Sequence, residues 1–520
     1  MNPYIKVCLQ LFLFTRIFFI FIITIVYSTK LVSKYDLSTD LLSISEISDE
    51  PISSFEKKIS NFLSYFSSYD AIHFILISKN NYFNDNIFAF FPLFPWLIRG
   101  FARIFEIILP FESEFIPFML SGFILSNILC FANCLLIFII IFNITNSFKR
   151  AKICVFLFLI NPGTIFYISI YSENLYLMLQ LIFIHFVIKS GQEQYEELNS
   201  KILGNITEKK PTFFLQIASI IIGLLMTRSN SLFLCTYFAV PVLIILFFKE
   251  KYVHSYNFFN FYYNFCQFIK IYKKVFKEVG LYVVLCFHAA LCFIFMTKYK
   301  PKWSICYHIK KGINKGLTKY DLFYKWCTHD KDNEIHSFYS YIQKEYWNVG
   351  FLNQYSINTI DRIALALPMN ILSLYVLNKL YHYFNFPELI SEFNLGKFFV
   401  TNTIYEDKIL LHHDEHDKHD LHAHSKNFYR NSITSNAVIL GGGLNYLFNF
   451  LVLVFMAHPQ INNRLLSSCP ILYLAISRDV IDFLENNRKG NYYKGFAILF
   501  FFITFALLGC IMQVGAYGFA

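Results

Sequence analysis

The sequence predicts an all-α polytopic membrane protein, and three observations support that prediction. Of the 520 residues, 56% are hydrophobic and 20% aromatic but only 15% are charged, which is too apolar for a soluble chain of this length. The apolar residues gather in runs whose lengths approach the roughly twenty residues needed to cross a bilayer. Basic residues lie between those runs, where they indicate the orientation of the chain in the membrane and contact with lipid headgroups. The net charge of +10 therefore does not indicate a nucleic-acid partner.

The first apolar run covers residues 7–28 and is long enough to cross a membrane. No small-residue cleavage site follows it, so we expect a retained signal anchor. Arg16 interrupts this run, and an arginine inside a span usually faces protein or water. The run 86–109 is also apolar, but its two prolines and two arginines suit a helix that lies at the membrane interface.

Ten further apolar runs predict spans, so we expect about eleven in all. They cover residues 115–142, 151–164, 165–188, 212–227, 231–248, 279–297, 360–383, 437–457, 465–477 and 495–518. Some are shorter than about twenty residues and need tilting or thinning to cross. With a cytosolic N-terminus, most of the basic connecting segments lie in the cytosol, as the positive-inside tendency expects.

This topology predicts one multispan domain over residues 1–520 with three large loops. The first luminal loop, 30–114, contains the interfacial helix, and 298–359 forms a second luminal loop. Residues 384–436 form a cytosolic loop with a His/Asp-rich insert at His412–His424. Such side chains can hold a transition metal, but a solvated insert fits better because no fixed ligand geometry is implied. We therefore predict no metal site there.

The twelve cysteines are scattered and form no CxxC pair, so they do not indicate a zinc or thiol-exchange site. Those inside apolar runs are expected to be buried small residues. Cys306 and Cys327 differ because they share the loop 298–359. If that loop lies in an oxidising lumen, the two can form a disulfide, and otherwise they remain free thiols.

Every polar cluster that interrupts an apolar run falls on the predicted luminal face. Asp70 lies there beside His73, ahead of the aromatic segment that contains Arg99. A single carboxylate at a membrane boundary often only caps a helix. Held near a sugar donor, however, it can take a proton from an attacking hydroxyl, which is the work of a general base.

The segment NPGTIFYISIYSENLY, Asn161–Tyr176, breaks a long apolar run. Asn-Pro-Gly is first of all a turn signal, and it places Glu173 at the head of the next helix. An acidic residue in a first helical turn stabilises the helix dipole. Glu173 is therefore either structural or a ligand for substrate hydroxyls.

Two arginines interrupt other runs on the same face. Arg228 lies in TRSN, which ends at Asn230, and Arg464 lies in HPQINNRLLSSCP. A buried arginine keeps its charge and needs an anionic partner. That partner is either Glu173 or Asp70, or the phosphate of a lipid substrate. Arg464 alone could snorkel to the interface, but with Arg228 it could form a phosphate clamp.

The string SYIQKEYWNVGFL, residues 340–352, precedes the span at 360–383. Aromatic residues at that level commonly form an interfacial belt. Aromatic faces separated by amides also make a sugar-binding surface, because amides both donate to and accept from hydroxyls. The residues concerned are Tyr341, Gln343, Trp347 and Asn348.

Taken in order, these motifs resemble those of the GPI mannosyltransferase 2 (PIG-V) family. The resemblance rests on YDAIHF, AFFPLFPWLIR, NPGTIFYISIYSENLY, TRSN, SYIQKEYWNVGFL with ALPMNILSL, and HPQINNRLLSSCPILY, from about Thr15 to about Ser477. The SYIQ string is its most specific part. It implies a glycosyltransferase of GT-C architecture, with about eleven spans, a large first luminal loop and an interfacial helix. That family transfers the second mannose, in α1,6 linkage, from dolichyl-phosphate-mannose to the GPI-anchor precursor at the luminal face of the endoplasmic reticulum.

The resemblance also implies roles for the candidate residues. Asp70 becomes the base of an inverting displacement, although Tyr69 stands where the family usually has Trp. The donor phosphate is expected to be bound by Arg228, Arg464 and Arg99. The residues expected to bind the substrates are His73, Glu173, Asn230, Tyr341, Gln343, Trp347 and Asn348. No cofactor beyond the lipid donor is implied, metal dependence stays open, and so does the need for a small accessory membrane subunit.

Two other interpretations remain. The chain could be another dolichyl-phosphate-mannose-dependent luminal enzyme, acting on N-glycan precursors or on a different GPI mannose, although the SYIQ string argues against that. It could also be a transporter or an assembly scaffold. A transporter should show internal repeats with broken helices in corresponding halves, and the sequence shows broken runs without a repeat. A scaffold would not require Asp70.

Overall fold

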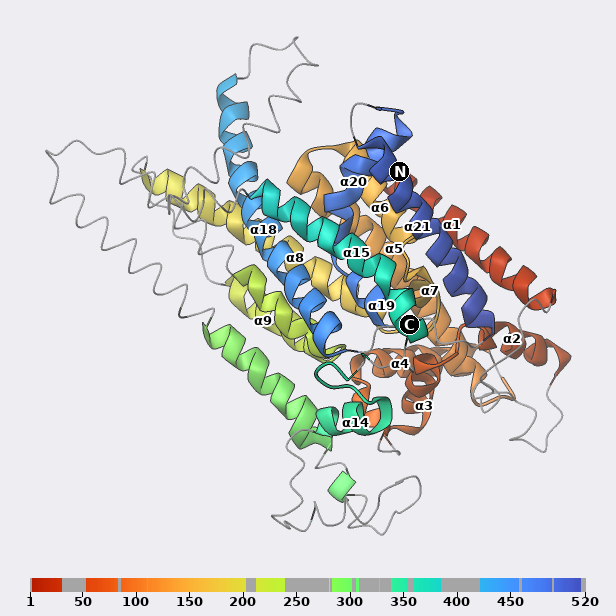
Figure 1. Ribbon diagram of the computed structural model, residues 1–520. Helices are drawn as coiled ribbons and strands as arrows, with labels where there is room; N and C mark the ends of the chain where they lie inside the picture. The colour runs from red at the N-terminus through yellow and green to blue at the C-terminus, as the bar shows by residue number, and fades with distance from the viewer. Residues whose placement is uncertain are drawn as a thin grey trace, which may run out of the picture.

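A computed structural model provides the fold, and within the residues that it describes the chain is helical without a strand. These residues are 2–29, 53–82, 86–109, 111–202, 212–238, 280, 283–301, 305–307, 327, 338–353, 355, 360–384, 421–457, 461–488 and 491–515. The helices form a bundle with smaller elements gathered at one end (Figure 1). The side chains of the predicted insert His412–His424 lie outside this description.

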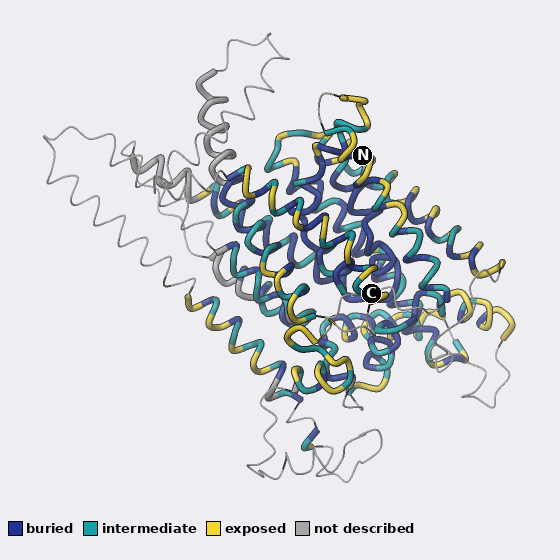
Figure 2. The backbone as a smooth tube through the Cα atoms, in the orientation of Figure 1, coloured by how far each residue is buried: buried dark blue, intermediate teal, exposed yellow. Residues whose placement is uncertain are grey.

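Six of the described helices are long and apolar enough to cross a membrane. They are α1 (Pro3–Ser28), α5 (Ile116–Thr145), α8 (Glu173–Ile202), α15 (Ile360–Tyr383), α18 (Leu421–Phe455) and α21 (Tyr492–Val514). The apolar windows of α5 and α8 are 56% and 61% buried inside the protein, against 28% for α1 and α15. The pair α5 and α8 therefore forms the centre of the bundle, as the burial colouring shows (Figure 2). The prediction of an all-α polytopic membrane protein is confirmed.

Four shorter helices occupy other predicted runs. They are α6 (Phe148–Leu159), α9 (Thr212–Leu225), α20 (Pro470–Leu484) and the apolar helix Val283–Thr297. Two runs differ from a continuous span. The run 165–188 is divided between α7 (Thr164–Ile168) and α8, with a non-helical segment between the two helices. The run 231–248 begins as the 3-10 helix η3 (Ser229–Phe238), and its remainder lies outside the description. The expected number of eleven spans stays a prediction.

The first predicted luminal loop folds into short helices at one end of the bundle (Figure 1). These are α2 (Ser54–Ser64), α3 (Asp70–Asn80), η2 (Asn86–Ala89) and α4 (Leu93–Ile108). Helix α14 (Phe338–Trp347) from the second large loop lies against them. Elements far apart in the sequence therefore cover the same end of the bundle.

Helix α4 has the character expected of an interfacial helix. It buries Phe94, Ile98 and Ala102 against the protein, while Trp96 and Ile107 remain exposed. Its 16 residues are too few to cross a bilayer by themselves. One apolar face is therefore left for lipid, which is the arrangement of a helix that lies along a membrane surface.

A disulfide joins Cys306 to Cys327, with the two Cα atoms 5.5 Å apart. Of the two alternatives open for these cysteines, the bonded one is confirmed. Next to the bond, Ile305 packs with Phe88 of η2 and Ile342 of α14. The bond thus lies within the second large loop, and the packing of Ile305 on Phe88 holds this part of it against the first.

This disulfide predicts a specific labelling pattern for membranes solubilised in the presence of a thiol-blocking reagent. Cys306 and Cys327 should take a second maleimide label only after reduction, because a disulfide sulfur is not a nucleophile. Mass spectrometry of the peptides measures this. In a Cys306→Ser variant, Cys327 should be blocked without reduction, and labelling of both residues before reduction in the unmodified protein would contradict the bond.

Candidate active site

Arg464 joins three parts of the chain that are distant in sequence. It lies in the short helix α19 (Asn462–Leu466) and is buried. Its Nη1 donates to Oδ2 of Asp70 at 2.5 Å, and its Nε donates to Oε1 of Glu173. These carboxylates begin α3 and α8 respectively. One guanidinium therefore sets the relative positions of two helices and of α19.

Glu173 receives a second arginine. Nη2 of Arg228 lies 2.6 Å from the Glu173 carboxylate oxygen Oε1. The Glu173 side chain is fully buried, and the Arg228 side chain is 12% exposed. Two carboxylates and two guanidiniums thus form a neutral cluster, which lowers the cost of burying each charge. Of the two roles open for Glu173, this placement favours the structural one.

The two carboxylates differ in their access to solvent. The Asp70 side chain is 32% exposed, whereas that of Glu173 is 0% exposed. Asp70 is therefore the carboxylate of this cluster that a substrate can reach.

The backbone just before Asp70 is strained. Tyr69 has a φ of 58°, in the left-handed region that a bulky residue rarely adopts. Such a conformation costs on the order of 1–3 kcal/mol and persists only where surrounding contacts enforce it.

The Asn-Pro-Gly segment forms the turn that its sequence predicts. The Asn161 side-chain oxygen Oδ1 accepts from the Gly163 N–H at 2.7 Å, and Thr164 N–H donates to the Asn161 carbonyl at 2.9 Å. Gly163 packs directly against α19, because a Cβ on Gly163 would lie 2.8 Å from the Asn463 carbonyl oxygen and 3.3 Å from Cα of Arg464. The glycine thus permits the close approach that places Arg464.

Tyr171 supports the same cluster from the segment between α7 and α8. Its hydroxyl donates to the Ser68 carbonyl at 2.9 Å, just before Asp70, and its ring centroid lies 4.9 Å from Cζ of Arg464. A second ring, Phe166, lies 5.4 Å from the same atom. Aromatic faces attract a guanidinium, so both rings favour the observed position of Arg464. The sequence prediction missed this role, and its signal was a pair of aromatics inside the broken run.

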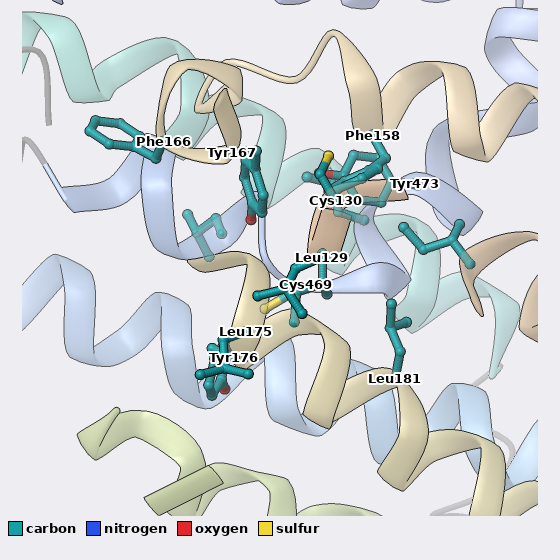
Figure 3. Close-up of a cluster of buried hydrophobic side chains, with 14 of the residues drawn as sticks. Leu129, Cys130, Phe158, Phe166, Tyr167, Leu175, Tyr176, Leu181, Cys469 and Tyr473 are labelled. Atoms are coloured by element: carbon teal, nitrogen blue, oxygen red, sulfur yellow. The ribbon is translucent and has the colours of Figure 1, made fainter. Parts of the chain in front are cut away.

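An apolar core lies under this turn. Figure 3 shows Phe158, Tyr167 and Tyr473 gathered there. The Phe158 ring centroid lies 5.1 Å from that of Tyr167 and 6.0 Å from that of Tyr473. These three rings belong to the buried hydrophobic core of the bundle.

His73 lies one turn after Asp70 on α3. Its ring stacks on Phe90 with centroids 4.8 Å apart. Burial lowers the pKa of His73, an effect that the nearby Asp70 charge opposes. Phe90 in turn meets the Trp347 ring edge-on at 6.1 Å, so α14 reaches the margin of the Asp70 region.

Several other predicted residues lie outside the four-residue cluster. Arg99 Nε and Nη2 donate to the carbonyls of Ser78 and Ile77 at 2.5 and 2.9 Å, at the end of α3. Asn230 donates to the Asn449 side chain at 3.0 Å, toward α18. On α14, Tyr341 packs on the cluster around Ile342, Gln343 is half-buried, and the following Asn348 is exposed. A substrate contact for these residues stays a prediction.

The fold and this site define a multispan membrane protein with an accessible carboxylate held by buried arginines. The family Mannosyltransferase (PIG-V) matches residues 5–520 of the chain. The chain therefore belongs to the PIG-V mannosyltransferase family, and the predicted family and enzyme class, a glycosyltransferase, are confirmed.

One curated relative matches the chain at low sequence identity. GPI mannosyltransferase 2 of Drosophila melanogaster is 24% identical over 339 residues, which are 64% of this chain and 67% of that protein.

Solved structures of the Archaeoglobus fulgidus oligosaccharyltransferase also match. One is AglB in complex with an inhibitory peptide and a dolichol-phosphate (11% identity, TM-score 0.38), and another is the apo form (12%, 0.35). They cover 88% and 86% of this chain, but the chain spans about half of their length, 52% in both.

The buried cluster predicts a stability difference between two acidic residues. Glu173→Gln removes the charge shared by Arg228 and Arg464, and breaking a buried pair costs about 3–5 kcal/mol. Thermal unfolding of the purified protein should therefore shift to clearly lower temperature. Glu485→Gln is the matched control, because Glu485 pairs with Lys149 at the surface and such pairs contribute little. Equal unfolding temperatures for the two variants would contradict a structural role for Glu173.

The contact at Gly163 predicts a loss of activity from one added methyl group. Gly163→Ala forces the backbone at Asn463 to move and with it Arg464. Because small displacements in an active site cost large factors in rate, mannose transfer should fall about tenfold or more. Gly100→Ala in α4 is the control, since nothing lies within 4 Å of a Cβ there. Full activity of Gly163→Ala in membranes would show that the close approach is not needed.

Proposed function

We propose that this chain transfers the second mannose, in α1,6 linkage, from dolichyl-phosphate-mannose to the GPI-anchor precursor at the luminal face of the endoplasmic reticulum, with a GT-C architecture. Family membership supports mannose transfer, with a glycolipid acceptor and a lipid-linked donor in the membrane. The Drosophila relative is named GPI mannosyltransferase 2, and this name supports the addition of the second mannose as the step that the chain performs. The SYIQ string of α14 lies at the margin of the site and supports the same choice.

The observation that supports this mechanism most strongly is the contrast between the two carboxylates. Asp70 is accessible and oriented by Arg464, while Glu173 is buried between two arginines. A retaining mechanism needs a second carboxylate near the reacting carbon as nucleophile. In this cluster only Asp70 is open to a substrate. A single displacement with one base fits that arrangement.

In this displacement the 6-hydroxyl oxygen of the acceptor mannose attacks the anomeric carbon of the donor. Asp70 takes the hydroxyl proton as the new C–O bond forms. The bond between the anomeric carbon and the phosphate oxygen breaks, and dolichyl phosphate leaves with the bonding electrons. The β-linked donor thus gives an α-linked product.

The departing phosphate needs positive charge, which the arginines supply. Nη1 of Arg228 is buried and makes no hydrogen bond to any described residue, so it has an N–H to offer. Arg464 holds Asp70 beside the same place. Donors fixed in advance at a developing charge stabilise a transition state strongly. We give Arg228 the main phosphate contact and Arg464 the role of orienting the base. We propose no cofactor besides the lipid donor.

The disulfide supports the luminal assignment. Disulfides persist in oxidising compartments such as the lumen of the endoplasmic reticulum. Next to Cys306–Cys327, Ile305 packs on Phe88 of η2 and Ile342 of α14, at the end of the bundle where α3 carries Asp70. This proximity supports a luminal position for Asp70.

Asp70→Asn tests the base directly. The variant keeps the shape of the side chain but cannot accept the proton, so transfer should fall about a hundredfold or more. The measurement is lipid analysis of cells that lack their own second GPI mannosyltransferase and express either form. The single-mannose GPI intermediate should disappear only with the unmodified chain.

Glu114→Gln is the matched control, because Glu114 is an exposed acid of the same loop paired with Lys79. It should clear the intermediate as the unmodified chain does. An Asp70→Asn protein that is present in the membrane and fully active would reject Asp70 as the base. Persistence of the intermediate with the unmodified chain would reject the proposed acceptor.

A further inference from the structure

Trp347 is an exposed tryptophan that is linked to the Asp70 region through two other rings. It ends α14, and 36% of it is exposed. Its ring meets Phe90 edge-on, with centroids 6.1 Å apart, and the Phe90 ring stacks on His73 at 4.8 Å. His73 lies one turn after Asp70, close enough for the Asp70 charge to oppose the lowering of the His73 pKa by burial. The three rings therefore form a continuous row that begins beside the proposed base.

The chain around Trp347 is held by backbone hydrogen bonds. Val349 N–H donates to the Gln343 carbonyl at 2.9 Å and closes the end of α14. Leu352 N–H donates to the Phe455 carbonyl at 2.8 Å, at the end of α18. Trp347 is thus held between the first large loop and α18, while part of its side chain stays open. A rigid, exposed aromatic side chain binds a ligand at a low cost in conformational entropy.

The surroundings of Trp347 differ from those of an interfacial belt, in which aromatic residues lie at the level of the lipid headgroups. Trp96 fits that role, because it is 47% exposed on α4, the helix with an apolar face left for lipid. On α14, by contrast, Lys344 and Glu345 are exposed just before Trp347. The exposed part of Trp347 therefore lies near charged side chains, which suits contact with a polar ligand in water.

A sugar ring has the properties that this row of side chains can recognise. An aromatic face packs on the apolar C–H groups of a sugar. His73 adds a polar group, since its Nδ1 is buried and makes no hydrogen bond to any described residue. Buried polar atoms normally have a partner, and a sugar hydroxyl can either donate to this nitrogen or accept from it. Trp347 and His73 thus offer an apolar surface and a polar group in one row.

The place of Trp347 relative to Asp70 indicates which sugar it meets. In the proposed displacement the donor mannose and the attacking mannose come together at Asp70. The donor carries a single sugar, and beyond its phosphate there is only lipid. The acceptor continues from the attacking mannose into further sugars. Contact from Asp70 to Trp347 runs through His73 and Phe90, so Trp347 suits the acceptor sugar that follows the attacking mannose.

We propose that Trp347, Phe90 and His73 form an acceptor subsite, which binds the sugar next to the attacking mannose. This inference rests on the proposed function and names the part of the acceptor that the enzyme recognises. Trp347 packs on the face of that sugar, and His73 makes a hydrogen bond to a hydroxyl. Binding a sugar that does not react helps to direct the 6-hydroxyl toward Asp70. Trp347 is here a binding residue and takes no part in the transfer of the proton.

The test uses the purified full chain in phosphatidylcholine nanodiscs and two synthetic acceptors. The long acceptor is a single-mannose GPI precursor with short lipid chains. The short acceptor keeps the terminal mannose, the phosphate and the lipid, but a flexible chain replaces the intervening sugars. Dissociation constants are measured for both acceptors and for dolichyl-phosphate-mannose, each ligand being added alone. The variants are Trp347→Leu and Trp347→Phe. Trp96→Leu is the matched control, because it removes another exposed tryptophan that lies on α4.

The unmodified chain should bind the long acceptor more tightly than the short one. Trp347→Leu should raise the dissociation constant of the long acceptor roughly fivefold or more and that of the short acceptor less than about twofold, because only the long acceptor places a sugar on this ring. Trp347→Phe should retain most of the affinity, since it keeps an aromatic face. Binding of the donor should stay unchanged in both variants, and Trp96→Leu should bind all three ligands normally.

Three results would overturn the inference. Equal weakening of both acceptors would show that Trp347 supports the Asp70 region and does not bind a second sugar. Weakening confined to the donor would assign Trp347 to the donor. Unchanged binding in Trp347→Leu would leave Trp347 as an interfacial aromatic residue like Trp96. If the acceptors bind as expected but the unmodified chain transfers no mannose, the proposed function fails while the sugar subsite stands.

Discussion

The ion pairs of Arg464 with Asp70 and Glu173 are the interaction on which the site depends. Asp70 starts a helix of the first large loop, Glu173 starts a helix of the bundle centre, and Arg464 lies close to the C-terminal end of the chain. Burying such charges is costly unless each is paired and hydrogen-bonded. Arg228 completes the balance at Glu173. The geometry at Asp70 is therefore set by electrostatic requirements deep in the protein.

The broken helices supply the space for this cluster. A continuous helix through residues 161–173 would satisfy its own backbone but could not place Gly163 against α19 or Tyr171 against Ser68. Non-helical backbone at membrane depth is tolerated where protein covers it. Here it is fully buried, and the Ile170 N–H donates to the Phe66 carbonyl at 3.0 Å. The irregular segment thus ties the first loop to the bundle centre beside Asp70.

Much of the fold could be predicted from the sequence because bilayer thickness constrains the length of apolar runs. The polar interruptions Asp70, Glu173, Arg228 and Arg464 were also recognisable, since charge inside an apolar run needs a reason. The sequence did not decide whether the two arginines pair with these carboxylates or bind the phosphate of a substrate. Contacts across 291 and 394 residues depend on how helices pack, which hydropathy does not encode.

The details that the sequence missed are matters of side-chain direction. Arg99 lies on the predicted interfacial helix but points to the end of α3, where it donates to two backbone carbonyls. Arg464 could by sequence also have snorkelled to the interface, but its side chain is buried and pairs with Asp70 and Glu173. Residue type indicated a cation in both cases. The partner of each cation depends on the side-chain conformation and on how distant elements pack.

The configuration of the new glycosidic bond tests the central claim most directly, because the proposed role of Asp70 as a base implies a single displacement with inversion. The purified chain would be given dolichyl-phosphate-mannose and a synthetic single-mannose GPI acceptor, and the product analysed by NMR. We predict an α-linked mannose at the 6-position, inverted from the β-linked donor. A β-linked product would contradict the role of Asp70 as the base of a single displacement, because retention requires two successive displacements.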